Sequence, residues 1–168
     1  MFKWFSKKEQ VLEELSLSKI GTDLHSHLIP GVDDGARDME ASILLIKKFI
    51  DLGFKKIITT PHIMSDLYQN TPEIINSGLS KLKQELIKQE IDIIVEAAAE
   101  YYVDYNFEQK IGVEKFMTFG DKNILIEFSF LEPPRNMYDI IFKLQLEGYK
   151  IVLAHPARYR YFSLEDYN

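Results

Sequence analysis

Short apolar runs alternate along the chain with segments in which apolar residues recur at helical spacing. The apolar runs predict five strands, at residues 19–25, 55–62, 91–102, 123–129 and 149–156. The helical segments lie between them, at about 39–52, 71–86, 105–115 and 135–148. Strands that are almost wholly apolar and that alternate with helices are typical of an α/β protein whose parallel sheet is covered by helices.

Residues that favour helix ends support these limits. Asp38 is a good N-cap for the first helix, and Gly53 is a good residue to end it. The second helix has a stronger start, because the capping hydroxyl of Thr71 precedes Pro72 and the acidic Glu73. The pattern therefore predicts a regular strand–helix order through the chain.

Composition narrows the class of protein. The chain has 168 residues, the length of one ordinary domain, and its 46% hydrophobic and 27% charged residues fit a folded protein. The net charge of −6 argues against a nucleic-acid partner. No apolar run approaches the roughly 20 residues that cross a bilayer, and the first residues do not resemble a signal peptide, so we expect a cytoplasmic protein. The lack of cysteine excludes a disulfide framework, a thiolate zinc site and a cysteine nucleophile.

Histidine and glutamate stand at or near the end of every predicted strand. In chain order they are His25, His27, His62, Glu100, Glu127 and His155. Because the carboxyl ends of parallel strands collect on one rim, where catalytic residues gather, we expect these six side chains to lie together.

The residue types indicate a metal site. His25 and His27 are two positions apart, so their side chains leave an extended segment on the same side and can bind one ion. Imidazole suits zinc, manganese, iron or nickel, and a carboxylate can bridge two ions. Six such ligands exceed the needs of one tetrahedral ion, so the sequence predicts a cluster of two or three ions. Such clusters hold phosphoryl groups and activate water.

Other polar residues have two interpretations. Asp33 and Asp34 either orient a ligating histidine or belong to a solvated turn. Arg158 is a candidate phosphate-binding residue, since guanidinium matches two phosphate oxygens; an ordinary surface arginine is the alternative. Glu96 competes with Glu100 as the ligand of the third strand. A single histidine at a strand end is more often a hydrogen-bonded rim residue, and only the whole set favours metal.

Several motifs, in this order, carry a family resemblance: "DLHSHLIPGVDDGA", "TPH", "AAAEYY", "LIEFS" and "LAHPARY". They resemble the PHP-type (polymerase and histidinol phosphatase) metallophosphoesterases, and most closely the bacterial manganese-dependent protein-tyrosine phosphatases of the CpsB/CapC (YwqE-like) group. The resemblance runs from about residue 22 to 162. HxH with "TPH" indicates only the superfamily, whereas "LHSHLIPGVDDGA" with "AHPARY" is specific to the phosphatases.

The resemblance implies a distorted TIM-like β/α barrel with a three-metal site, usually manganese, with iron, zinc or magnesium as alternatives. It implies that the six strand-end residues are the metal ligands and that Arg158 holds phosphate, with Asp33 and Asp34 beside the catalytic centre. The implied reaction is removal of phosphate from phosphotyrosine. The implied substrate is a bacterial tyrosine kinase that regulates capsule or exopolysaccharide synthesis.

The sequence departs from the family at two places. Ala157 stands where the family usually has glutamate. The family also continues past the end of this chain with a further motif that supplies an aspartate and a histidine. We therefore expect a domain at 19–168 that lacks its C-terminal part, after a lead segment at 1–18. About five βα units would leave the first and last strands as unpaired edges, so we expect these 168 residues to be unstable, to associate with one another or to be completed by another chain. We expect the family's activity of the intact protein and not full activity of these 168 residues alone.

Two other functions compete with the tyrosine phosphatase. One is a PHP phosphoesterase that acts on a small metabolite such as histidinol phosphate, and it would need a closed pocket rather than an open rim. The other is a non-catalytic fragment that binds a partner, with the aromatic and cationic residues of "MFKWFSKK" near a membrane.

Overall fold

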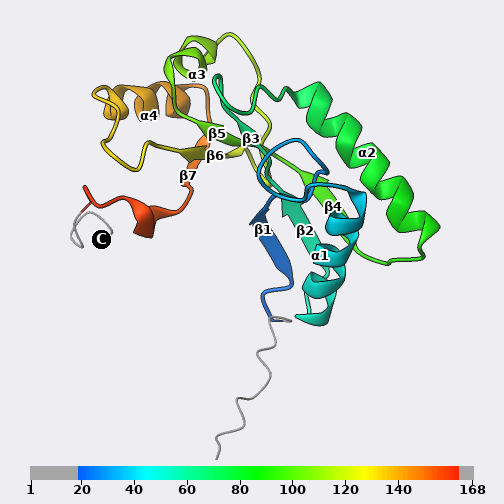
Figure 1. The fold of residues 1–168 in the computed structure, drawn as a ribbon. Helices are drawn as coiled ribbons and strands as arrows, with labels where there is room; N and C mark the ends of the chain where they lie inside the picture. The colour runs from blue at the N-terminus through cyan, green and yellow to red at the C-terminus, as the bar shows by residue number, and fades with distance from the viewer. Residues whose placement is uncertain (1–18, 163–168) are drawn as a thin grey trace, which may run out of the picture.

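The computed structural model describes residues 19–162 (Figure 1), and the predicted lead segment 1–18 lies outside the described residues. The strands are β1 (Thr22–Ser26), β2 (Lys56–Thr59), β3 (His62–Ile63), β4 (Ile94–Ala97), β5 (Glu100–Tyr102), β6 (Asn123–Glu127) and β7 (Lys150–Leu153). The helices are α1 (Met39–Asp51), α2 (Pro72–Lys88), α3 (Tyr105–Lys110) and α4 (Met137–Leu146), followed by the 3₁₀ turn η1 (Pro156–Arg158).

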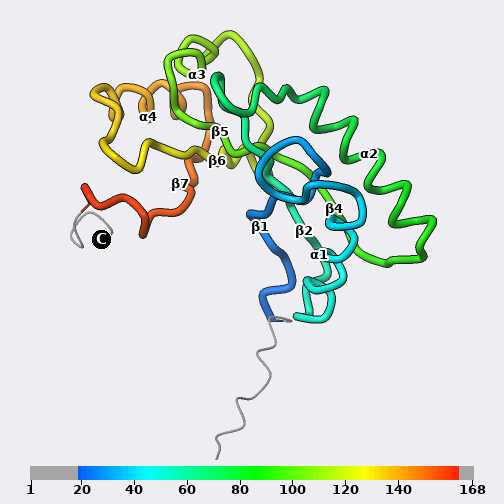
Figure 2. Tube along the Cα trace, in the orientation of Figure 1, coloured from blue at the N-terminus to red at the C-terminus, as the bar shows by residue number. Residues whose placement is uncertain are grey.

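The strands form two parallel sheets that meet end to end. One sheet has the order β1-β2-β4 and the other β3-β5-β6-β7, and every pair of neighbouring strands is parallel. The trace in Figure 2 runs from β4 into β5 after only two residues. The predicted α/β class with parallel sheets is confirmed.

Two of the predicted strands are each divided in two, which corrects the sequence interpretation. The strand predicted at 55–62 breaks at residues 60–61, where Pro61 has no N–H for a sheet ladder. The strand predicted at 91–102 breaks at residues 98–99. Hydrogen bonds cross both breaks, because Ala98 N–H donates to Thr59 and Glu100 N–H donates to Pro61.

The helices begin where their capping residues predict. The Asp38 carboxylate accepts from the backbone N–H of Ala41, and the Thr71 hydroxyl accepts from that of Ile74. Helix α3 is shorter than predicted. It ends at Lys110 because the chain turns at Gly112, whose φ of 78° is in the left-handed region.

The helices lie outside the strands and bury their apolar faces against them (Figure 1). Helix α2 buries Ile75, Leu82 and Leu86, which lie at helical spacing on one face. It approaches the β1–α1 connection closely at Gly78, where a Cβ atom would overlap the side chain of Ile29. This packing fixes the segment that follows the two histidines of β1.

Strand β1 is an outer strand of the first sheet and β7 of the second, and within the described residues they do not pair with each other. Their carboxyl ends nevertheless approach, since the Nε2 atoms of His25 and His155 are 3.1 Å apart. The two sheets together are therefore strongly curved, and the curvature gathers residues from both outer strands at one rim. Within the described range, no helix has the length and apolar character to span a membrane.

Candidate metal centre

The six residues at the predicted strand ends come together at one rim. His25 lies in β1, and His27 follows that strand directly. His62 and Glu100 begin the paired strands β3 and β5 at equivalent positions. Glu127 ends β6, opposite Tyr102 of β5, and His155 follows β7. Parallel register therefore brings these side chains together, as the sequence predicts.

The carboxylate of Glu100 is the centre of the cluster and is fully buried. Four imidazoles surround it. Its Oε2 atom is 3.2 Å from His27 Nε2 and 3.2 Å from His62 Nδ1, and its Oε1 atom is 3.3 Å from His155 Nε2 and 3.6 Å from His25 Nε2. One carboxylate thus faces histidines from β1, β3 and the end of β7.

These contacts leave hydrogen-bonding capacity unused. Neither oxygen of Glu100 has an aligned hydrogen-bond partner, nor does the buried Nδ1 atom of His62. Burial raises the pKa of Glu100, but the neighbouring imidazoles, His27 foremost, outweigh it and hold the pKa below its ordinary value. The ionised form of the carboxylate is therefore favoured. Its oxygens face imidazole nitrogens, and both kinds of atom can bind metal ions.

Two histidines are held neutral, which is the form that binds metal. Burial lowers the pKa of His25 and of His155 below the ordinary value. The Nδ1 atom of His25 is hydrogen-bonded to the hydroxyl of Thr60 at 2.6 Å, which leaves Nε2 facing the cluster. His155 has a φ of 48°, a left-handed conformation that is costly for most side chains, immediately before Pro156.

The two aspartates after β1 differ in position. Asp33 is buried and accepts hydrogen bonds from the Nδ1 atom of His27 at 2.7 Å and from the backbone N–H groups of His62 and Gly35. Asp34 is 62% exposed, with an oxygen 3.6 Å from His62 Nε2. Although burial lowers it, the pKa of His27 is raised to about 10 by its hydrogen bond to Asp33 and by the nearby carboxylate of Glu100. Asp33 therefore orients His27, while Asp34 lies beside the ligand atoms.

Glu127 belongs to the cluster, whereas Glu96, the competitor of Glu100, lies at the surface. Glu127 is 5% exposed, and burial, followed by the charge of Glu100, raises its pKa to about 7. Its Oε2 atom is 3.9 Å from His62 Nδ1. Glu96 is exposed and forms an ion pair with Lys56 at 2.8 Å. Of the two glutamates weighed for the third strand, only Glu100 belongs to the cluster.

The donor set fits a group of divalent ions. Three triads have ligand atoms that all lie within 4.8 Å of one another: His25, His27 and Glu100; His27, Asp34 and His62; and His62, Glu100 and Glu127. The triads share members, as neighbouring metal positions would. The unpaired oxygens of Glu100 and Nδ1 of His62 are the atoms that bound cations would satisfy.

The mouth of the cluster combines Arg158, which the sequence predicted there, with aromatic and apolar residues that the sequence did not predict. The hollow above the histidines measures about 390 Å³ and is lined in part by Met64, Phe130 and Arg158. Phe130 is 43% exposed, and the Arg158 guanidinium carbon lies 5.7 Å from its ring centre. The ring of Tyr68 stacks on His62 at 5.4 Å. No motif of the sequence had singled out Met64, Tyr68 or Phe130.

Fold and cluster together define a parallel α/β protein with a histidine–carboxylate centre of the kind that holds divalent ions. The family model described as "Capsular polysaccharide synthesis, CpsB/CapC" matches residues 21–166. The chain belongs to this CpsB/CapC family, and the resemblance seen in its motifs is confirmed.

Named relatives agree with this assignment. The chain is 36% identical to tyrosine-protein phosphatase YwqE of Bacillus subtilis over 139 residues, which cover 82% of this chain and 55% of YwqE. It is 28% identical to tyrosine-protein phosphatase CpsB of Streptococcus agalactiae over 86% of this chain and 59% of that protein. The chain thus spans a little over half the length of these relatives.

A solved structure shares the fold. It comes from a study of YwqE from Bacillus subtilis and CpsB from Streptococcus pneumoniae, described as metal-dependent tyrosine phosphatases. The TM-score is 0.76 at 36% identity, and the match covers 83% of this chain and 57% of the solved one. The mixed α/β fold with parallel strands that the sequence predicts is therefore shared with this solved structure.

Proposed function

We propose that the protein is a metal-dependent phosphomonoester hydrolase that removes phosphate from phosphotyrosine in proteins. One observation carries the proposal: a buried, unpaired carboxylate, Glu100, is surrounded by four histidines beneath a mouth lined by Arg158 and Phe130. The named functions of the relatives support it. The lack of cysteine is consistent with it, because a phosphatase without a thiolate needs another source of nucleophile.

In this proposal the ligands are the six strand-end residues, His25, His27, His62, Glu100, Glu127 and His155. The ions are two or three, with Mn²⁺ as the proposed metal. When bound, divalent ions at such a site lower the pKa of water and offset charge on phosphate oxygens. Asp33 keeps Nδ1 of His27 engaged, so that Nε2 faces the cluster, and Asp34 borders the ligand atoms on the solvent side.

The mouth accounts for the choice of phosphotyrosine. Arg158 is exposed, and its guanidinium can bind two phosphate oxygens at once. The ring of Phe130 offers an apolar face to the ring of tyrosine. Phenol has a pKa of about 10, so the tyrosine oxygen leaves with little help from a protonated group. Water supplies the new bond to phosphorus as the bond to the tyrosine oxygen breaks.

Partners and assembly extend the proposal. The proposed substrate is a bacterial tyrosine kinase that regulates capsule synthesis, in line with the description of the family. We further propose that the curved sheets are part of a β/α barrel, since the ends of β1 and β7 meet at His25 and His155. The unpaired sides of these strands are the proposed surfaces for association with another chain.

The test compares three substrates at the same Mn²⁺ concentration: a phosphotyrosine peptide, the matching phosphoserine peptide and histidinol phosphate. We expect phosphate release from the phosphotyrosine peptide, its loss with a chelator, and more than one equivalent of metal in the purified protein. Hydrolysis of histidinol phosphate alone would favour the metabolite phosphoesterase. A metal content well under one equivalent without hydrolysis would favour a non-catalytic protein.

A further inference from the structure

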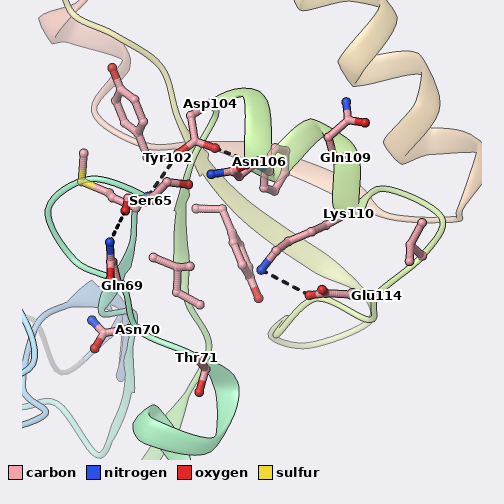
Figure 3. Close-up of a pocket in the computed structure, with 15 residues that line it drawn as sticks. Ser65, Gln69, Asn70, Thr71, Tyr102, Asp104, Asn106, Gln109, Lys110 and Glu114 are labelled. Carbon is pink, nitrogen blue, oxygen red and sulfur yellow. Dashed lines mark hydrogen bonds and ion pairs between the residues drawn. The ribbon is translucent and has the colours of Figure 1, made fainter.

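A second hollow lies at the same rim, next to the metal centre. It measures about 550 Å³ and is larger than the hollow above the histidines. Loop 64–71 forms one wall, and helix α3 with the turn at 110–114 forms the other (Figure 3). We call this hollow the α3 cleft.

The α3 cleft borders the hollow above the histidines at Met64. Ile63 and Tyr101 line the cleft, and each directly follows a proposed ligand, His62 or Glu100. Because neighbouring residues of a strand point to opposite faces, the cleft lies on the other side of β3 and β5 from these ligands. Met64 lines both the cleft and the hollow above the histidines. Methionine is an adaptable apolar side chain against which a bound chain can pack. A chain bound at the metal centre would therefore reach the cleft by crossing the rim at Met64.

The walls of the cleft are held in place by hydrogen bonds that do not use its open face. The Asp104 carboxylate accepts from the backbone N–H groups of Ser65 and Phe107, which ties loop 64–71 to the start of α3. The Asn70 side chain donates to the backbone carbonyls of Val32 and His62. These hydrogen bonds connect loop 64–71 to helix α3 and to strand β3, which contains the proposed ligand His62.

The open face combines neutral and apolar groups. The Asn106 amide is exposed at the cleft and can both donate and accept, as the backbone of a peptide requires. Lys110 is paired with Glu114 at 3.4 Å within one wall of the cleft, so these two charges offset each other. Val113, which is 80% exposed, adds an apolar surface. This chemistry suits an extended polypeptide with polar and apolar side chains better than a second anion.

We propose that the α3 cleft binds the peptide segment next to the phosphotyrosine of a protein substrate. This inference rests on the proposed function, and it names the feature that separates a protein substrate from free phosphotyrosine. The mouth of the metal centre accommodates the phosphotyrosyl group, whereas the cleft binds residues a few positions away along the substrate chain. An extended chain advances about 3.3 Å per residue, so short flanks reach across Met64 into the cleft.

The test measures binding to the full chain loaded with Mn²⁺, by calorimetry with non-hydrolysable probes. One probe is a capped phosphonodifluoromethyl analogue of phosphotyrosine. The other is a nine-residue peptide with this analogue at its centre and flanks of serine and leucine. The cleft variant is Asn106→Ala with Lys110→Ala. The matched control is Asn76→Ala with Lys83→Ala, two exposed residues of α2 outside the cleft.

We expect the peptide to bind at least about tenfold more tightly than the capped analogue. The cleft variant is expected to weaken peptide binding by about five- to tenfold, the loss typical of one or two net hydrogen bonds, while binding of the capped analogue stays within about twofold. Equal affinity of the two probes, or an equal loss for both in the cleft variant, would overturn the inference. Failure of the capped analogue to bind at all would overturn the proposed function as well.

Discussion

The substitution Glu100→Gln isolates the role of the central carboxylate. Glutamine keeps the size of the side chain and removes its charge, in a site where four imidazole nitrogens lie 3.2 to 3.6 Å from the carboxylate oxygens. If Glu100 bridges bound ions, the variant loses the ligand that two of the three triads share. Removing an outer partner of a ligand already costs about 10- to 100-fold in metal affinity, so loss of this ligand should cost at least about 100-fold.

The size of the effect follows from binding linkage. With Mn²⁺ at about 100 times the dissociation constant of the original protein, bound metal stabilises the fold by about 2.7 kcal/mol. A 100-fold weaker variant retains only about 0.4 kcal/mol at the same Mn²⁺ concentration. For a domain of this size, these energies correspond to a rise in Tm of about 5 to 11 °C and about 1 to 2 °C respectively.

The assay is thermal unfolding with Mn²⁺ and with a chelator, and Glu96→Gln is the matched control. Glu96 lies in the same segment of chain but is exposed and paired with Lys56, so its substitution should leave the metal-dependent rise unchanged. With a chelator, Glu100→Gln is expected to have a lower Tm than the original protein, because the neighbouring imidazoles favour the carboxylate; the comparison therefore uses the rise in Tm that Mn²⁺ causes in each protein. An undiminished rise in Tm for Glu100→Gln would refute the assignment of this residue as a metal ligand.

Three further predictions test the support of the site and of the core. In Gly35→Ala, the new Cβ would overlap the carbonyl oxygen and the Cβ of His27. We expect the free energy of unfolding, measured in urea, to fall by about 1 to 3 kcal/mol, and Mn²⁺ binding to weaken. If both quantities were unchanged, the close packing of Gly35 against His27 would be contradicted. In Asp33→Asn, the carboxylate that orients His27 is lost. Calorimetry should then show about 10- to 100-fold weaker Mn²⁺ binding. An unchanged affinity would show that His27 does not need this partner. Burial raises the pKa of Tyr159 to about 12, so the folded state favours the neutral phenol. This preference stabilises the folded protein below the unfolded pKa of about 10, and the stabilisation is lost as the pH rises towards 12. The part due to Tyr159 between pH 8 and pH 11 is about 1.4 kcal/mol, and Tyr159→Phe should reduce the measured loss by that amount; an equal loss in both proteins would argue against it.

Features that depend on local sequence were predictable. The caps at Asp38 and Thr71 act within one turn of their helices, and both appear in the structure. The gathering of His62, Glu100 and the other strand-end residues was also predictable, because parallel register needs only the strand positions. These inferences required no knowledge of packing.

Features that depend on the exact path of the chain were not predictable. The break of the second strand at Pro61 changes which residues pair, although the apolar run continues through it. The bond from His27 to Asp33 spans a turn whose shape the "PGVDDG" segment does not fix, so orientation and solvation were equally good interpretations. Phe130 reaches the mouth only because the chain after β6 bends towards η1, where Arg158 lies.

The left-handed conformation of His155 links two functions in one short segment. Its φ of 48° reverses the chain after β7, so that the imidazole faces Glu100 while η1 returns Arg158 to the same mouth only three residues later. The proposed metal ligand and the proposed phosphate-binding group are therefore mechanically coupled. A change of the backbone dihedral angles at residue 155 would therefore move the imidazole and the guanidinium together.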